Sequence, residues 1–140
     1  ACVLANKLSK LGVHNVMMYD VSKVHPSYIN AKAWEYSHLV LASPTYNLNL
    51  FLPMENFLHD LGTLCFKNRK ISVLGCHTWS SVAHKELVNY VENVFKNCEL
   101  LPTTLDMKSS LHADQETVID TMAKEIADDV AAYPDPNTLL

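Results

Sequence analysis

Hydrophobic positions along this chain follow two alternating patterns, one typical of amphipathic helices and one typical of short buried strands. Helical spacing covers residues 3–11, 27–36, 53–64, 82–95 and 118–130. Apolar runs of strand length cover residues 16–20, 38–42, 71–75 and 100–107. Because helices and strands alternate, the pattern predicts an α/β domain of three layers, a parallel sheet with helices on both faces.

Glycine and proline mark the borders of these segments. Gly12 follows the first helical segment, Pro26 precedes the second, and Pro134 ends the last. A chain of 140 residues is the length of one domain with its own core. We therefore expect the domain to span residues 1–133 and a loose tail to follow over residues 134–140.

Two of the predicted strands end in small polar turns. The run at 38–42 continues into Ser43-Pro44-Thr45-Tyr46-Asn47, and the run at 71–75 continues into Cys76-His77-Thr78-Trp79. The carboxyl ends of parallel strands meet at one edge of the sheet, where open α/β folds bind their ligands. These two loops are therefore predicted to hold a flat cofactor between them.

Charge and motif content argue against several other classes of protein. A net charge of −4 disfavours nucleic-acid binding, which needs clustered Lys and Arg. No apolar run approaches the ~18 residues of a membrane span. The four cysteines lack CxxC or zinc-ligand spacing, which is typical of reduced thiols in the cytoplasm. Without a zincin run, a nucleophile elbow or a glycine-rich nucleotide loop, we assign no catalytic residue and no metal site.

The first polar turn resembles a known flavin-binding loop. Ala42–Asn47 followed by Phe51–Glu55 is similar to the second flavin-binding loop of the flavodiiron proteins, also called A-type flavoproteins. Leu58–Arg69 and Met107–Leu111 also resemble their flavodoxin-like domain, so the resemblance covers nearly the whole chain. It implies a flavodoxin-like fold that binds FMN non-covalently and passes electrons to a separate diiron site, which reduces oxygen or nitric oxide.

The resemblance also implies which residues surround the cofactor. Thr45 and Asn47 would supply hydroxyl and amide groups, and Tyr46 and Trp79 would cover the faces of the flavin ring. The alternatives are that Tyr46 is a surface turn residue and that Trp79 packs in the core. The expected cofactor-binding residues are Ser43, Pro44, Thr45, Tyr46, Asn47, Leu48, Cys76, His77, Thr78 and Trp79.

The chain departs from the family pattern at three places. Leu48 stands where relatives often have Gly, and a Cβ there limits how closely the backbone approaches the ring. The loop at Cys76–Trp79 lacks the Gly that relatives tend to have. Ala1 stands inside the predicted first helix, so the family's phosphate loop is missing, and FMN binding is expected to be weak or absent.

The first, central strand of a flavodoxin-like sheet is missing for the same reason. The predicted strands at 16–20 and 38–42 would then flank an empty slot, each with a row of unpaired backbone groups. Met17 and Met18 are expected to pack in the core as part of the first of these strands. We therefore expect the sequence to be truncated at its amino end.

The main functional hypothesis is an FMN-binding electron-transfer domain of a flavodiiron oxygen or nitric oxide reductase. Its expected partners are an N-terminal diiron domain in the full-length protein, a rubredoxin-like or flavin reductase donor, and a second copy in a homodimer. One alternative is a degenerate flavodoxin-like or receiver-like interaction domain without flavin. Another is a flavin-using quinone or NADPH reductase, which would bind a second substrate above the ring.

Overall fold

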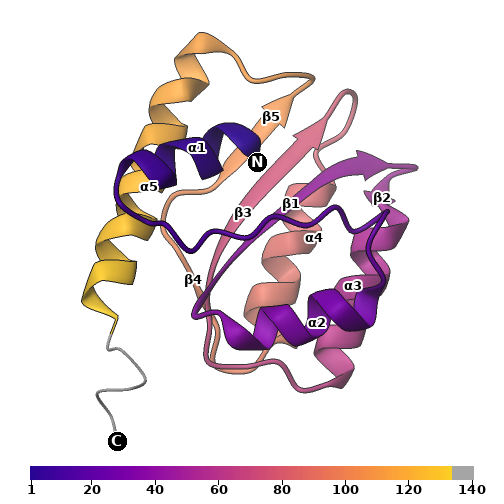
Figure 1. Cartoon of the computed structure of the whole chain (residues 1–140). Helices are drawn as coiled ribbons and strands as arrows, with labels where there is room; N and C mark the ends of the chain where they lie inside the picture. The colour runs from indigo at the N-terminus through magenta and orange to yellow at the C-terminus, as the bar shows by residue number, and fades with distance from the viewer. Residues whose placement is uncertain (134–140) are drawn as a thin grey trace, which may run out of the picture.

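A five-stranded sheet forms the middle layer of this computed structural model, with helices on both faces (Figure 1). The structure describes residues 1–133, and the tail expected at 134–140 lies outside the described residues. The helices are α1 (Cys2–Lys10), α2 (Pro26–Glu35), α3 (Leu52–Thr63), α4 (Ala83–Asn89), the short π-helix η1 (Tyr90–Val94) and α5 (Ala113–Ala132). The strands are β1 (His38–Tyr46), β2 (Asn49–Leu50), β3 (Lys70–His77), β4 (Glu99–Leu100) and β5 (Leu105–Lys108).

The sheet is mostly parallel, as the alternating pattern predicts. Its order is β2-β1-β3-β4, and β5 also pairs with β3, farther along that strand than β4 does. Strands β1, β4 and β5 all run parallel to β3. Only β2 is antiparallel, because a tight turn folds it back on the end of β1. The prediction of an α/β fold with a parallel sheet is confirmed.

The predicted strand at 16–20 is wrong, because this segment pairs with no other strand among residues 1–133. Met17 and Met18 are 55% and 58% exposed, so their expected place in the core is also wrong. A β-strand is stable only when its backbone groups find partners on a neighbouring strand. The segment instead crosses the molecule as an extended loop in front of β1 (Figure 1).

Two other predicted elements are interrupted. The strand expected at 100–107 is divided into β4 and β5, since Pro102 lacks an N–H for the ladder and the Thr103 N–H donates to the Glu125 carboxylate, 3.1 Å away. The helix expected at 82–95 changes from α4 to η1. None of the helices within residues 1–133 is long and apolar enough to cross a membrane.

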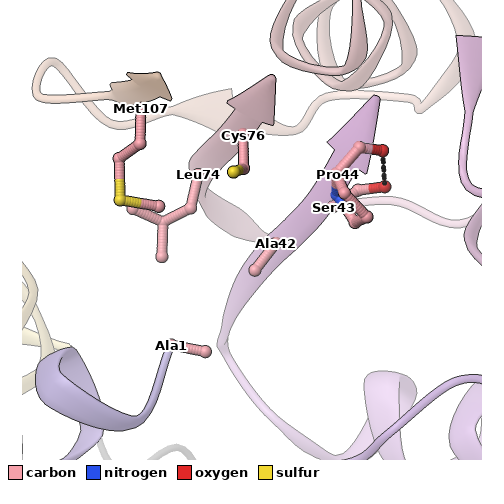
Figure 2. Close-up of a pocket in the computed structure, with 7 residues that line it drawn as sticks. All are labelled: Ala1, Ala42, Ser43, Pro44, Leu74, Cys76 and Met107. Atoms are coloured by element: carbon pink, nitrogen blue, oxygen red, sulfur yellow. Dashed lines mark hydrogen bonds between the residues drawn. The ribbon is translucent and has the colours of Figure 1, made fainter. Parts of the chain in front are cut away.

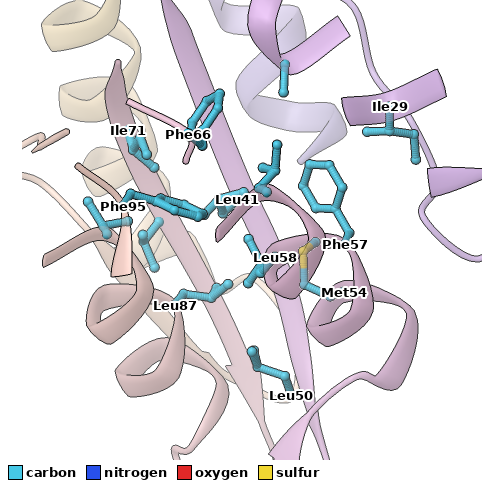
Figure 3. Packing of buried hydrophobic residues seen from close by; sticks show 14 of the residues in the cluster. Ile29, Leu41, Leu50, Met54, Phe57, Leu58, Phe66, Ile71, Leu87 and Phe95 are labelled. Atoms are coloured by element: carbon cyan, nitrogen blue, oxygen red, sulfur yellow. The ribbon is translucent and has the colours of Figure 1, made fainter. Parts of the chain in front are cut away.

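The larger core fills the space between the sheet and helices α2, α3 and α4 (Figure 3). Leu41 of β1 and Ile71 of β3 point toward Leu58 of α3 and Leu87 of α4, and each is at most 1% exposed. Phe66, which follows α3, is fully buried at the end of this core. The helices bury these side chains because apolar residues recur on one face of each.

A second core lies on the opposite face of the sheet, under α1 and α5. Leu4 and Leu8 of α1 pack with Leu74 of β3 and with Met122 and Ile126 of α5. The first helix and the last helix of the chain therefore cover the same face, side by side (Figure 1). On their outer surface, the Lys7 ammonium lies 2.5 Å from the Asp120 carboxylate and joins the two helices.

Asp129 ties the carboxyl-terminal part of α5 to the sheet. Its carboxylate accepts hydrogen bonds from Lys70 Nζ at 2.6 Å and from His38 Nε2 at 2.5 Å. Burial by itself would raise the pKa of the Asp129 carboxyl, but the hydrogen bonds from Lys70 and His38 outweigh that effect and hold the pKa below its ordinary value. The ionised form of Asp129 is therefore favoured in the folded protein.

Asp129→Asn is expected to lower stability at neutral pH and to remove part of the acid sensitivity of the protein. A carboxyl whose pKa is lower in the folded state than in the unfolded state stabilises the fold above its ordinary pKa of about 3.9. That contribution is lost as the pH falls through the lower folded-state value. The free energy of unfolding, measured by urea denaturation, should therefore differ between wild type and variant at pH 6, and this difference should be smaller at pH 3. An equal difference at both pH values would contradict the lowered pKa of Asp129.

Candidate functional site

The carboxyl ends of β1, β3 and β5 meet at one edge of the sheet and enclose a small pocket of about 190 Å³ (Figure 2). Side chains from all three strands surround the pocket, together with the residue that precedes α1. The lining residues are Ala1, Ala42, Ser43, Pro44, Leu74, Cys76 and Met107. The structure therefore brings the two predicted loops to the same edge, as the parallel order of β1 and β3 requires.

A tight turn joins β1 to β2 beside this pocket. Tyr46 pairs with Asn49, so Asn47 and Leu48 form the turn, with φ values of 49° and 56°. Positive φ at both positions is typical of a hairpin turn of type I′, which favours Asn and Gly. Leu48 pays a steric cost in this conformation and is 73% exposed. Tyr46, at the base of the turn, is 57% exposed.

The hydroxyl of Thr45 supports a neighbouring helix. Its oxygen accepts hydrogen bonds from the backbone N–H groups of Val82 at 3.3 Å and of Ala83 at 3.0 Å. These N–H groups open α4 and have no partner within the helix. Thr45 therefore fixes the start of α4 at the site, while its own O–H remains available as a donor.

Asp106 organises the second loop from β5. Its carboxylate lies 3.0 Å from His77 Nδ1 and accepts a hydrogen bond from the Ser81 hydroxyl. His77 ends β3 and Ser81 precedes α4, so one carboxylate holds both ends of the loop that carries Thr78 and Trp79. Asp106 is not among the site residues predicted from the sequence. A lone acid inside a short apolar strand was the available signal.

Gly75 lets α4 approach the end of β3. A Cβ at this position would lie 2.6 Å from the His84 Cβ and 2.8 Å from Asp106 Oδ1. Contacts this short force either the helix or the carboxylate to move. His84 is itself held at this place, with Nε2 2.9 Å from the Thr104 hydroxyl.

Trp79 is 97% exposed, so the alternative that it packs in the core is wrong. The Cys76 thiol donates to the Ser109 carbonyl oxygen, with a sulfur–oxygen distance of 3.4 Å, and takes no part in the His77 hydrogen bond. Neighbouring residues of a strand point to opposite faces, which is why this pair forms no activated thiol. Across residues 1–133, no group of three or more His, Cys, Asp or Glu side chains is arranged to hold a metal ion.

Comparison with known proteins identifies the fold. No protein-family model matches the chain. No curated protein sequence matches it either. Among solved structures, rubredoxin oxygen:oxidoreductase from Desulfovibrio gigas superimposes with a TM-score of 0.84 at 22% identity, over 94% of this chain and 32% of its own. The flavodiiron core of Flv1 from Synechocystis gives a TM-score of 0.82 at 17% identity, over 93% of this chain and 32% of its own.

Flavodoxins match over most of their own length. The Fusobacterium nucleatum flavodoxin bound to flavin mononucleotide superimposes with a TM-score of 0.62 at 14% identity, over 90% of this chain and 89% of its own. The present chain thus spans about a third of the length of the two larger proteins. Together with the parallel sheet and its two helical layers, these similarities show that the chain has a flavodoxin-like fold.

Proposed function

We propose that this chain is an FMN-binding electron-transfer domain. One observation carries the proposal, an almost fully exposed Trp79 beside a polar loop at the carboxyl end of a parallel sheet. Exposure of so large an apolar side chain is unfavourable in water unless a partner covers it. The flavin ring is a flat partner of matching size, and a flavodoxin of the same fold is bound to FMN.

The residues at this edge fit a flavin ring. Tyr46 and Trp79 stand exposed at the ends of the neighbouring strands β1 and β3, where they are able to cover the two ring faces. Between these strands, Ser43, Pro44 and Cys76 line the pocket seen in Figure 2. FMN, when bound, supplies the redox chemistry, and no acid, base or nucleophile of the chain is needed for it.

The chain's own groups would position and shield the ring. The backbone N–H groups of the turn at Tyr46, Asn47 and Leu48 and the amide of Asn47 provide hydrogen-bond partners at its polar edge. Asp106 keeps the loop at 77–81 in place through His77 and Ser81. The remaining site residue, Thr78, lies in that same loop beside Trp79.

The phosphate of FMN would find few partners on the described residues. Ala1 lines the pocket, and no Lys or Arg does so. Ala1 also gives no side-chain cap to α1. Since charge-assisted hydrogen bonds dominate phosphate recognition, we expect weak binding of FMN by residues 1–140 as they stand.

The partners of the domain are also proposals. The two larger proteins of the same fold, a rubredoxin oxygen:oxidoreductase and a flavodiiron core, support a diiron domain as the acceptor of electrons and a rubredoxin-like donor. A flavin reductase as the donor and assembly as a homodimer are proposed from the resemblance of the sequence alone. Four free thiols, two of them exposed, suit a reducing cytoplasm. We further propose that residues 1–133 act as one flavodoxin-like unit.

Titration of the protein with FMN, followed by flavin fluorescence, tests this function. We expect saturable quenching, and we expect Trp79→Ala to weaken binding about fivefold or more, since stacking contributes about 0.5–1.5 kcal/mol beyond burial. Riboflavin serves as the ligand that lacks the phosphate, and it should bind nearly as well if the ring provides most of the contacts.

Controls separate this proposal from its alternatives. Leu64→Ala changes a half-exposed residue that follows the carboxyl end of α3, opposite to the end of that helix nearest the turn at residues 47–48, and should leave the FMN affinity unchanged. Absence of quenching by both flavins would favour an interaction domain without flavin. Oxidation of NADPH or reduction of a quinone by the flavin-loaded protein would favour a reductase.

A further inference from the structure

An aspartate–histidine pair lies at the carboxyl ends of β3 and β5, on the face of the sheet that α4 covers. His77 Nδ1 is 3.0 Å from Asp106 Oδ1, and the second carboxylate oxygen accepts a hydrogen bond from the Ser81 hydroxyl. The side chains of His77 and Asp106 are largely buried, with exposed fractions of 18% and 24%. Histidine is the side chain that ordinarily changes its charge between pH 5 and 8, so this pair can do more than support a loop.

The carboxylate of Asp106 determines which nitrogen of His77 exchanges its proton. An ionised carboxylate only accepts hydrogen bonds, so Nδ1 carries a hydrogen in both the neutral and the charged form of the ring. Among residues 1–133, the hydrogen bond of the His77 side chain is the one at Nδ1. Uptake and loss of a proton therefore take place at Nε2, while the hydrogen bond to Asp106 stays in place.

The other charged or titratable groups that face His77 come from β5 and α4. Lys108 is the neighbour of His77 in the parallel ladder, but it is exposed to solvent, which screens its charge. His84 of α4 lies on the same face, with its Nε2 already 2.9 Å from a hydroxyl group. The adjoining end of β1 contributes Thr45, which is uncharged. Asp106 is therefore the opposite charge that can stabilise a protonated His77.

His77 stands within electrostatic reach of the proposed flavin site. Trp79 follows it by two residues, so their Cα atoms are at most about 7 Å apart. This separation is shorter than the Debye length of ~8 Å at physiological ionic strength. The Ser109 N–H donates to the His77 carbonyl oxygen at 2.8 Å, which fixes the start of the loop. A charge that develops on a ring stacked against Trp79 would therefore act on the imidazole.

We propose that His77 is a redox-linked proton acceptor of the flavin site and that Asp106 is the residue that positions it. The inference rests on the proposed function. His77 binds a proton from water at Nε2 when electrons from the donor reach the ring, and it releases this proton when the electrons leave. The only bond that forms or breaks on the protein is this N–H bond. Electron transfer does not require the proton, whose binding sets the potential at which the electrons are held.

The physical basis is that negative charge beside an imidazole favours its protonated form. Two unit charges about 10 Å apart, at an effective dielectric constant of about 20, change a binding constant by about tenfold. We therefore expect His77 to bind its proton about tenfold more tightly when the flavin is reduced. By linkage, protonation of His77 favours reduction to the same extent.

NMR of ¹⁵N-labelled histidine side chains tests this coupling in the intact chain saturated with riboflavin. Riboflavin lacks the phosphate, whose own ionisation near pH ~6 would interfere. The titration runs from pH 5 to 9 with the flavin oxidised, and again after reduction by dithionite under nitrogen. We expect about tenfold tighter proton binding at His77 in the reduced sample and little change at the other six histidines. The neutral ring of His77 should carry its hydrogen on Nδ1.

Potentiometry of matched variants provides the second readout. Tenfold corresponds to about 30 mV for a two-electron couple, so the midpoint potential of wild type should fall by about 30 mV more between pH 5 and 9 than that of His77→Gln. His59→Gln changes an exposed histidine of α3 and should behave as wild type. Asp106→Asn should weaken proton binding at His77 in both redox states, because the ring loses its opposite charge.

Two results would overturn this inference while leaving the flavin function intact. One is equal proton binding at His77 in the oxidised and reduced samples. The other is a neutral His77 ring with its hydrogen on Nε2, since Asp106 would then not orient it. Failure of both riboflavin and FMN to bind, seen by flavin fluorescence before any reduction, would overturn the proposed function and this inference together.

Discussion

Phe66→Ala is expected to lower the free energy of unfolding by about 3–5 kcal/mol, the range found when a buried aromatic side chain is deleted from a core. Phe66 is fully buried, and its ring meets those of Trp34 and Phe95 edge to face, with centroid distances of 5.3 and 5.2 Å. The Arg69 guanidinium lies 5.9 Å from the same ring. These rigid neighbours belong to different segments, so the structure cannot easily collapse into the cavity.

Urea denaturation followed by circular dichroism measures this loss. Because the free energy of unfolding of a single domain is about 5–15 kcal/mol, a loss of this size would leave the alanine variant only marginally stable. Phe66→Leu keeps most of the volume and should lose less, so it serves if the alanine variant fails to fold. Trp79→Ala is the matched control, since deletion of this exposed aromatic should change stability by no more than about 0.5 kcal/mol. A loss below ~1 kcal/mol for Phe66→Ala would contradict the packing described here.

The second large effect is expected at Gly75. Gly75→Ala should destabilise the protein by about 1–3 kcal/mol, as overpacking does in a well-packed core. The added Cβ would lie 2.6 Å from the Cβ and 3.0 Å from the Cα of His84, so the backbone of α4 itself must move. The contact with Asp106 Oδ1 at 2.8 Å would also disturb the carboxylate that holds the second loop. We therefore expect weaker FMN binding together with the loss of stability.

Gly62→Ala provides the comparison. A Cβ at Gly62 would lie 2.9 Å from a terminal methyl of Val94, whose half-exposed side chain has room to shift toward solvent. Gly62 also lies inside α3, where alanine gains about 1 kcal/mol of helix propensity over glycine. Thermal unfolding should therefore show Gly62→Ala near wild type and Gly75→Ala well below it. Equal melting temperatures for the two variants would show that α4 moves away from a Cβ at position 75 without loss of stability.

Most of the parallel fold was predictable from local pattern. Apart from His38 and Ser72, the runs at 38–42 and 71–75 are apolar because helices cover both faces of β1 and β3, and that burial is visible in the sequence itself. The polar turns at Ser43–Asn47 and Cys76–Trp79 follow the ends of these strands for the same reason. The two turns lie at the same edge of the sheet because the strands are parallel, and the alternation of helices and strands along the chain already predicts that arrangement.

Long-range partners were not predictable in this way. Asp106 reaches His77 and Ser81, and Asp129 reaches His38 and Lys70, across separations of 25 to 91 residues. The sequence around a single acidic residue does not indicate which distant side chain its carboxylate will contact. The same holds for Gly75, whose importance arises from how closely α4 crosses the strand.

The sequence by itself determined the class of fold, the order of most helices and strands, and the two loops that form the candidate site. All of these depend on the hydrophobic periodicity and turn residues of short segments. Tertiary structure alone decided that residues 16–20 form no strand, although their composition favours one. A β-strand is stable only when it forms hydrogen bonds with a neighbouring strand. No strand among residues 1–133 pairs with this segment, so its local β propensity is not sufficient to make it a strand.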